Sequence, residues 1–124
     1  MNFDPIWSWP KPVQNPLPIF VGGNGEHTLK RVVDYGDAWM PIPGRGADIG
    51  NRMQQLQELA AEAGRGWIPV TIYGTLPRPE VVQHYADVGV DRCIFWLPSA
   101  PSDEVLPLLD RYQELAQEVA TAGA

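Results

Sequence analysis

The residues best suited to chemistry form a glycine-rich turn between a short apolar run and an amphipathic segment. Gly22-Gly23-Asn24-Gly25 follows the apolar run 18–21, and a helical pattern begins at Glu26. Glycines let backbone amides approach a ligand, and the N-terminus of the next helix adds unpaired N–H donors with partial positive charge. The side chains of Asn24 and Thr28 are further donors. The turn therefore predicts a site for a phosphate or for the polar edge of a cofactor; the alternative is a tight turn that needs glycine only for its dihedral angles.

The same turn does not fit a nicotinamide-binding site of the Rossmann type. Gly23-x-Gly25 matches the first part of that fingerprint, but Thr28 stands where a third small residue is needed. The fingerprint also requires an acid about 20 residues later, at the end of the next strand. In this sequence that run ends in Pro41-Ile42-Pro43.

Few other side chains indicate chemistry. Arg45 follows an expected strand and Trp39 lies within it, so both are candidates to bind substrate. We expect His27 and His84 to be exposed on helices, and the single cysteine, Cys93, to be an inert apolar residue of a strand. The spacing of these groups predicts no metal site, and it places no Ser/His/Asp grouping or carboxylate pair, so no catalytic residue is assigned.

Four strand–helix units are predicted to position these residues. Short apolar runs predict the strands, and apolar residues at helical spacing predict the helices. The strands are expected at 18–21, 38–42, 69–73 and 92–97, and the helices at 26–35, 48–63, from 79 to Gly89, and from 102 onward, with Pro107 delaying the last one. Trp39 and Trp96 are expected mainly in the core, with the lining of a pocket as the alternative. This α/β pattern implies a parallel sheet, either open and doubly wound or half of an eight-stranded β/α barrel, which takes about 250 residues in full.

Composition and charge exclude several classes of protein. Apolar residues make up 44% and charged residues 19% of the 124 positions, which is typical of a globular domain. A net charge of −6 disfavours binding to nucleic acid or to anionic membranes. The first residues, Met1-Asn2-Phe3-Asp4-Pro5, have neither a basic nor an apolar region, so no signal peptide is expected, and no apolar run approaches the roughly 18 residues of a membrane span. The single cysteine fits a reducing compartment, so a cytoplasmic location is expected.

The first segment differs from the rest in its content of proline. Five of the 13 prolines lie in the first eighteen residues, where they block helix formation. Residues 1–17 are therefore predicted to be an extended connector to a domain at 18–124. We expect Trp7 and Trp9 in this connector to lie against apolar surface of the domain.

Three strings in the first half resemble the luciferase-like monooxygenase family, especially its actinobacterial deazaflavin-dependent oxidoreductases. They are Ser8-Trp9-Pro10-Lys11-Pro12-Val13-Gln14, Pro18-Ile19-Phe20-Val21-Gly22-Gly23-Asn24-Gly25 and Tyr35-Gly36-Asp37-Ala38-Trp39-Met40-Pro41. A later string, Tyr85-Ala86-Asp87-Val88-Gly89-Val90-Asp91-Arg92, is similar to the family's last turn before its final strand, although many β/α barrels contain such a string. The resemblance covers most of the chain.

The resemblance implies the C-terminal half, strands five to eight, of a TIM-type (β/α)8 barrel. It also implies an oxidoreductase that uses FMN or coenzyme F420, a deazaflavin, to transfer a hydride to or from a small organic substrate. In the family, the turn after the fifth strand contacts the cofactor and its phosphate-bearing tail. That role transfers to Gly22, Gly23, Asn24, Gly25 and Thr28. Ring-stacking residues and most substrate-facing residues belong to the N-terminal half of the family's barrel.

Two alternatives remain open for the activity of this chain. It could be a non-catalytic half-barrel that binds a phosphate-bearing ligand or assembles with itself, or one chain of a split enzyme whose partner carries the other half. Four strands do not close a small barrel, and an open half leaves strand edges and apolar interior residues exposed. The expected interior residues include Phe20, Met40, Ile72 and Phe95. We therefore expect a homodimer or a higher oligomer.

Overall fold

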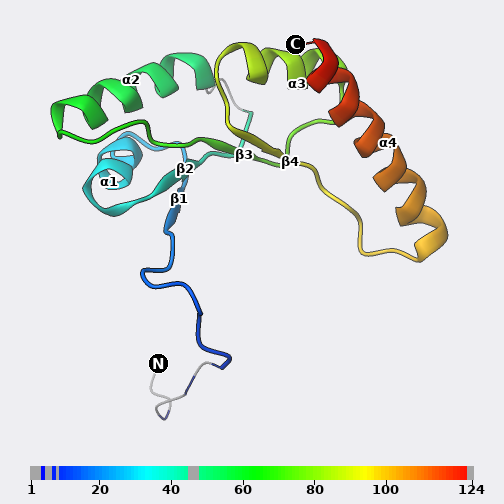
Figure 1. Ribbon diagram of the computed structural model, residues 1–124, viewed down its shortest axis with the longest axis horizontal. Helices are drawn as coiled ribbons and strands as arrows, with labels where there is room; N and C mark the ends of the chain where they lie inside the picture. The colour runs from blue at the N-terminus through cyan, green and yellow to red at the C-terminus, as the bar shows by residue number, and fades with distance from the viewer. Residues whose placement is uncertain (1–3, 5–6, 8, 45–47, 123–124) are drawn as a thin grey trace.

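Four β/α units follow one another in the computed structural model, which describes residues 4, 7, 9–44 and 48–122 (Figure 1). The elements alternate as expected from the sequence. Their bounds are β1 (Phe20–Gly22), α1 (Thr28–Tyr35), β2 (Ala38–Met40), α2 (Ile49–Glu62), β3 (Thr71–Tyr73), α3 (Pro79–Asp87), β4 (Arg92–Ile94) and α4 (Ser102–Ala122).

The strands are parallel and pair in chain order. β1 pairs with β2 and β3 pairs with β4, each as a two-stranded sheet. A single bridge between Trp39 and Val70 joins the two sheets, with Trp39 N donating to Pro69 O at 3.0 Å and Tyr73 N to Pro41 O at 3.0 Å. A doubly wound sheet reverses its strand order at a switch point, whereas barrel strands keep chain order. Among the described residues the strands follow chain order, with no reversal at the Trp39–Val70 bridge.

The strands are shorter than the sequence predicts, at three residues each. Proline explains part of the difference, because it has no N–H to donate to a neighbouring strand. Pro41 follows the last residue of β2, and Pro69 lies two residues before the first residue of β3. The predicted single sheet is consequently divided into two pairs of strands with one bridge between them.

The same hydrogen-bonding arrangement is present at the start of both strand pairs. Asp37 precedes β2 and its carboxylate accepts from Ile19 N at 2.7 Å; Asp91 precedes β4 and its carboxylate accepts from Val70 N at 2.8 Å. In each case the aspartate amide and the next amide both donate to the carbonyl of that same partner. The chain is thus a structural repeat of two β/α/β units, each held at its start by an aspartate.

The core lies between the strands and the helices. Val21, Trp39, Val70 and Ile72 point to this side, and they pack with buried residues of α1 and α2, including Leu56. Ile72 is fully buried in this core, so its predicted place among the exposed interior residues is wrong. Successive side chains of a strand point to opposite faces, so a shift of one residue moves a side chain to the other face. The face of the strands away from the core, called the open face below, carries Phe20, 42% exposed, and Tyr73, 38% exposed, with half-buried Met40.

Arg65 fastens the end of α1 to the segment after α2. Its guanidinium donates to the carbonyls of Val32, Val33 and Gly36 at 2.7–3.1 Å. Val32 O also accepts from the amide of Gly36 at 2.8 Å, whereas the carbonyls of Val33 and Gly36 lie at the C-terminal end of α1, where partners within the helix run out. A single side chain therefore satisfies both of them and holds the two helices together.

The last helix begins at Ser102, before Pro107, so the predicted delay at this proline is wrong. The amides of Glu104 and Val105 both donate to Pro101 O at 3.1 Å, which secures the first turn without any contribution from Pro107. Leu115 of this helix is buried, whereas Leu109 is 43% exposed, because α4 packs mainly on α3 (Figure 1).

Residues 9–17 lead away from the strands and helices instead of lying on them (Figure 1). Trp7 is 80% and Trp9 73% exposed, so the expected cover of apolar surface by these rings is wrong. The ammonium group of Lys11 lies 5.4 Å from the Trp7 ring centroid and 5.3 Å from that of Trp9. The lysine offers a cation–π contact in place of apolar burial.

In the part of the chain that the structure describes, no helix has the length and apolar character needed to cross a bilayer. No cluster of three or more histidine, cysteine, aspartate or glutamate side chains that could hold a metal ion occurs in the described ranges.

We predict that Gly36→Ala lowers the free energy of unfolding by about 1–3 kcal/mol, the usual cost of overpacking. A β-carbon at Gly36 would lie 2.7 Å from Val21 Cγ2 and 3.0 Å from Val32 O, within the packed contact of α1 and β1. Gly66→Ala is the matched control, because no atom lies within 4 Å of its β-carbon position. Urea denaturation of both variants tests this; equal stabilities would contradict the tight contact at Gly36.

Candidate functional site

The candidate site lies along the edge where the parallel strands end. The glycine turn follows β1, Ile42 follows β2, the segment Gly74–Pro77 follows β3, and Trp96 follows β4. Ligands of open α/β sheets and of β/α barrels bind at this carboxyl edge. Two neighbouring features occupy it: the glycine turn and an aromatic pocket.

Side chains from β2 and α2 hold the glycine turn by its carbonyl groups. The indole N–H of Trp39 donates to Gly23 O at 2.9 Å, and Arg52 Nη2 donates to Gly25 O at 3.0 Å. The amide of Thr28 also donates to Gly25 O, at 3.1 Å, and begins α1. The two carbonyls are therefore directed toward the protein.

The geometry of the peptide bond then decides where the amides point. In a trans peptide the C=O and N–H groups lie in one plane and point in opposite directions. Inward carbonyls on Gly23 and Gly25 turn the amides of Asn24 and Glu26 outward. Among the described residues, none accepts a hydrogen bond from either amide. The turn thus offers free N–H donors beside the N-terminus of α1, an arrangement suited to an anion.

Two buried polar atoms beside the turn lack partners among the described residues: Asn24 Oδ1 and Arg52 Nε. Asn24 Nδ2 donates to Ile42 O at 2.7 Å, which leaves the amide oxygen to accept. The Arg52 guanidinium lies 5.8 Å from the Trp39 ring centroid and forms no ion pair in the described part of the chain. A ligand with both hydroxyl donors and anionic oxygens matches these two atoms, as a phosphate on a polyol chain does.

The predicted site residues fall into two groups. Gly22, Gly23, Asn24 and Gly25 are at least partly exposed, and Gly23 has a φ of +102°, a conformation that favours glycine. Thr28 is fully buried beneath the turn, and its hydroxyl accepts from Arg31 Nη2 at 3.4 Å.

Of the two predicted substrate-binding residues, Trp39 is fully buried, so the structure shows it supporting the turn; its contact with substrate stays a prediction. Arg45 lies outside the described residues. His27 and His84 are exposed, as expected.

Arg52 is a candidate binding residue that the sequence did not reveal. It lies in the first turns of α2, next to the core residue Met53, 27 positions from Gly25. An arginine on an amphipathic helix is ordinarily exposed on its polar face. A basic residue early in a helix, where acids are favoured, was the only available signal.

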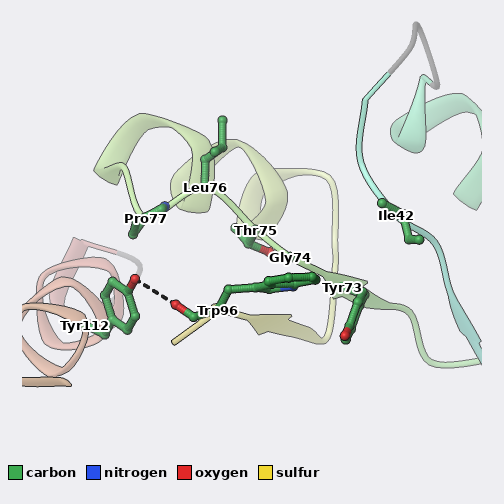
Figure 2. Close-up of a pocket in the computed structure, with 8 residues that line it drawn as sticks. All are labelled: Ile42, Tyr73, Gly74, Thr75, Leu76, Pro77, Trp96 and Tyr112. Atoms are coloured by element: carbon green, nitrogen blue, oxygen red, sulfur yellow. Dashed lines mark hydrogen bonds between the residues drawn. The ribbon is translucent and has the colours of Figure 1, made fainter. Parts of the chain in front are cut away.

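The aromatic pocket has a volume of about 300 Å³ and lies at the ends of β2, β3 and β4 (Figure 2). Its lining consists of Ile42, Tyr73, Gly74, Thr75, Leu76, Pro77, Trp96 and Tyr112. Trp96 is 63% exposed, so its expected place in the core is wrong, and the alternative that it lines a pocket is confirmed. β4 ends at Ile94, which leaves Trp96 in the following loop, where it forms one wall of the pocket (Figure 2).

Cys93 is a half-buried free thiol on β4, one of the strands that end at this pocket. Burial raises its pKa above the ordinary thiol value, although a hydrogen bond with Thr75 acts in the opposite direction. Burial likewise raises the pKa of Tyr85, with a further contribution from Cys93. A raised pKa keeps the thiol protonated at neutral pH, which agrees with the expected inert role.

Comparison with known proteins assigns a relationship to most of the chain. Residues 2–77 match the family model described as luciferase-like monooxygenase. Uncharacterized proteins of Mycobacterium tuberculosis and Mycobacterium bovis are each 33% identical to the chain over 113 residues. The match covers 90% of this chain and 40% of each relative, so the chain spans well under half the length of the curated relatives it matches.

We predict that Trp39→Phe lowers the free energy of unfolding by about 1–3 kcal/mol, because Gly23 O loses its donor. The variant should also shift the amide resonances of residues 22–25 in an ¹H–¹⁵N NMR spectrum. Trp67→Phe is the matched control: its indole donates at 3.3 Å to the carboxylate of Asp91, at the protein surface. Equal stabilities and unchanged turn resonances would contradict the anchoring role of Trp39.

Proposed function

The chain belongs to the luciferase-like monooxygenase family, and from this premise we propose that it binds the phosphate-bearing part of FMN or of coenzyme F420. It does so as the C-terminal half of a flavin- or deazaflavin-dependent oxidoreductase. The complete enzyme transfers a hydride between the cofactor and a small organic substrate.

The observation that carries the proposal is the pair of outward amides on the glycine turn. Trp39 and Arg52 fix the carbonyls of Gly23 and Gly25, so the donors are oriented before any ligand arrives. Prearranged donors bind an anion without an ordering cost. The backbone φ at position 23 is +102°, so any residue other than glycine would be strained there.

The chain's own residues have distinct roles in this proposal. Amides of the turn and the N-terminus of α1 hold the phosphate. Arg52 contributes the positive charge, and Asn24 Oδ1 accepts from a hydroxyl of the chain that links phosphate to ring. The bound cofactor supplies the hydride chemistry, while these residues bind and orient it.

The half-barrel architecture is part of the same proposal. Strands that pair in chain order and a core confined to the helix side support it. Residues 18–124 then form the half-barrel, and residues 1–17 form a connector. The open face, with Phe20 and Tyr73, is the side that the interior of a closed barrel would contain.

We predict that Gly23→Val weakens FMN binding by at least about tenfold, or 1.4 kcal/mol. Fluorescence titration of the full chain with FMN and with riboflavin separates the contributions, because riboflavin lacks the phosphate. The variant should bind FMN no better than riboflavin, while its affinity for riboflavin stays unchanged. Coenzyme F420 is titrated in parallel to choose between the cofactors.

Gly64→Val is the control for this experiment. Gly64 also has a positive φ, +68°, and no atom lies within 4 Å of its β-carbon position. It follows α2 and takes no part in the turn, so its variant should carry backbone strain without loss of FMN affinity. Unchanged FMN affinity in folded Gly23→Val would remove the turn from the site. Binding with no turnover would favour a non-catalytic half-barrel, and turnover only with an added N-terminal half would favour a split enzyme.

We also predict that the chain forms a homodimer or a higher oligomer. The exposed side chains of Phe20 and Tyr73 and the unpaired outer edges of β1 and β4 need cover. Two copies related by a twofold axis would pair these edges and enclose the open face. Light scattering at micromolar concentration measures the mass; a stable monomer of 13.8 kDa would contradict the prediction.

A further inference from the structure

We infer that the aromatic pocket at the ends of β2, β3 and β4 binds the uncharged planar ring of a small-molecule substrate. The inference rests on the proposed function for the role of the pocket in a reaction. Its binding property can be tested without any cofactor.

The ring of Trp96 forms a flat wall of the pocket. Neighbouring residues hold this ring in place, although it is exposed to solvent. Tyr73 packs edge-on against Trp96, with ring centroids 5.6 Å apart and an interplanar angle of 66°. On α4, Tyr112 donates its hydroxyl to Trp96 O at 3.0 Å (Figure 2). Two aromatic neighbours therefore orient a tryptophan that is 63% exposed.

Gly74 gives the Trp96 ring the space to lie against the end of β3. A β-carbon at Gly74 would lie 2.9 Å from Trp96 Nε1, and its φ of +79° also favours glycine. The ring consequently lies against the backbone at one side and presents apolar surface to the pocket (Figure 2). A flat, preformed aromatic surface favours stacking by another planar ring.

The chemical character of the lining decides the charge of the ligand. None of the eight lining residues carries a charged side chain. Two of the lining residues carry a polar donor with no acceptor among the described residues: the indole N–H of Trp96 and the hydroxyl of Tyr73. The pocket therefore suits an uncharged, largely apolar ring with one or two acceptor atoms, since a charge placed there would lose hydration without compensation.

The same lining argues against the ring of the cofactor as the occupant. A flavin or deazaflavin ring has a polar pyrimidine edge whose carbonyl and N–H groups need several partners when they leave water. The aromatic pocket offers few. The phosphate-binding groups lie at the end of β1, and the Asn24–Ile42 hydrogen bond connects that turn to the wall of the pocket. A substrate ring would thus lie beside the cofactor site on the same edge.

Titration of the full chain with N-phenylnaphthylamine, an uncharged fluorescent aromatic, tests the inference. We expect saturable binding that Trp96→Ala weakens by at least about tenfold, the loss of one stacked ring. Trp96→Leu keeps an apolar side chain but removes the flat surface, and should weaken binding as well. Circular dichroism verifies that each variant is folded.

Trp67→Ala is the matched control. Trp67 is 58% exposed and lines a separate groove of about 630 Å³ that runs along α2 and includes Val88, the residue after α3. If Trp67→Ala weakens binding and Trp96→Ala does not, the dye occupies that groove and the inference is overturned. Loss of dimer mass in Trp96→Ala by light scattering, with dye affinity unchanged, would identify a second copy as the occupant and would also overturn it.

Competition separates this inference from the proposed function. Saturating FMN should leave dye affinity unchanged if the pocket receives substrate; displacement by FMN would show that the cofactor ring occupies it. Gly23→Val should retain full dye binding, and Trp96→Ala should retain the difference between FMN and riboflavin. The proposal for each of the two sites can therefore be contradicted independently of the other.

Discussion

The hydrogen bond from the Trp39 indole to Gly23 O is the interaction on which the site depends. The backbone amide of the same residue donates to Pro69 O and joins the two sheets, while its ring fills the core and lies beside Arg52. One fully buried residue therefore connects the sheet, the core and the turn. The rigidity of the glycine turn comes from this connection, since glycine itself contributes none.

The buried side chains of α1, α2 and α3 pack on one side of the strands, and this arrangement has two consequences. It leaves Phe20 and Tyr73 on a face without helices, and it leaves the carboxyl edge accessible along its length. Along that edge the chemistry changes from amides and a guanidinium at β1 to uncharged aromatic groups at β3 and β4. A ligand pair with one anionic end and one apolar ring fits this gradient.

The two halves of the chain repeat one structural solution with different residues. Asp37 and Asp91 accept from the amides of Ile19 and Val70, and each aspartate lies directly before a strand. The flanking residues differ enough that no repeat is visible in the sequence. What is shared is a carboxylate that accepts from an amide where a parallel pair begins; the hydrogen bond to Val70 is partly buried, where an N–H without a partner would be costly, and the one to Ile19 is exposed.

The order of the elements and the position of the glycine turn follow from the amino-acid sequence alone. Both depend on local patterns: apolar runs, helical spacing, and the freedom of glycine at positive φ, seen at Gly23. The family relationship was also readable from strings of contiguous residues. Tertiary structure decided which way Ile72 faces, which partner Arg52 meets and how Trp96 becomes a wall of a pocket. These outcomes depend on strand register and on contacts between residues far apart in the chain, and local residue patterns carry no information about either.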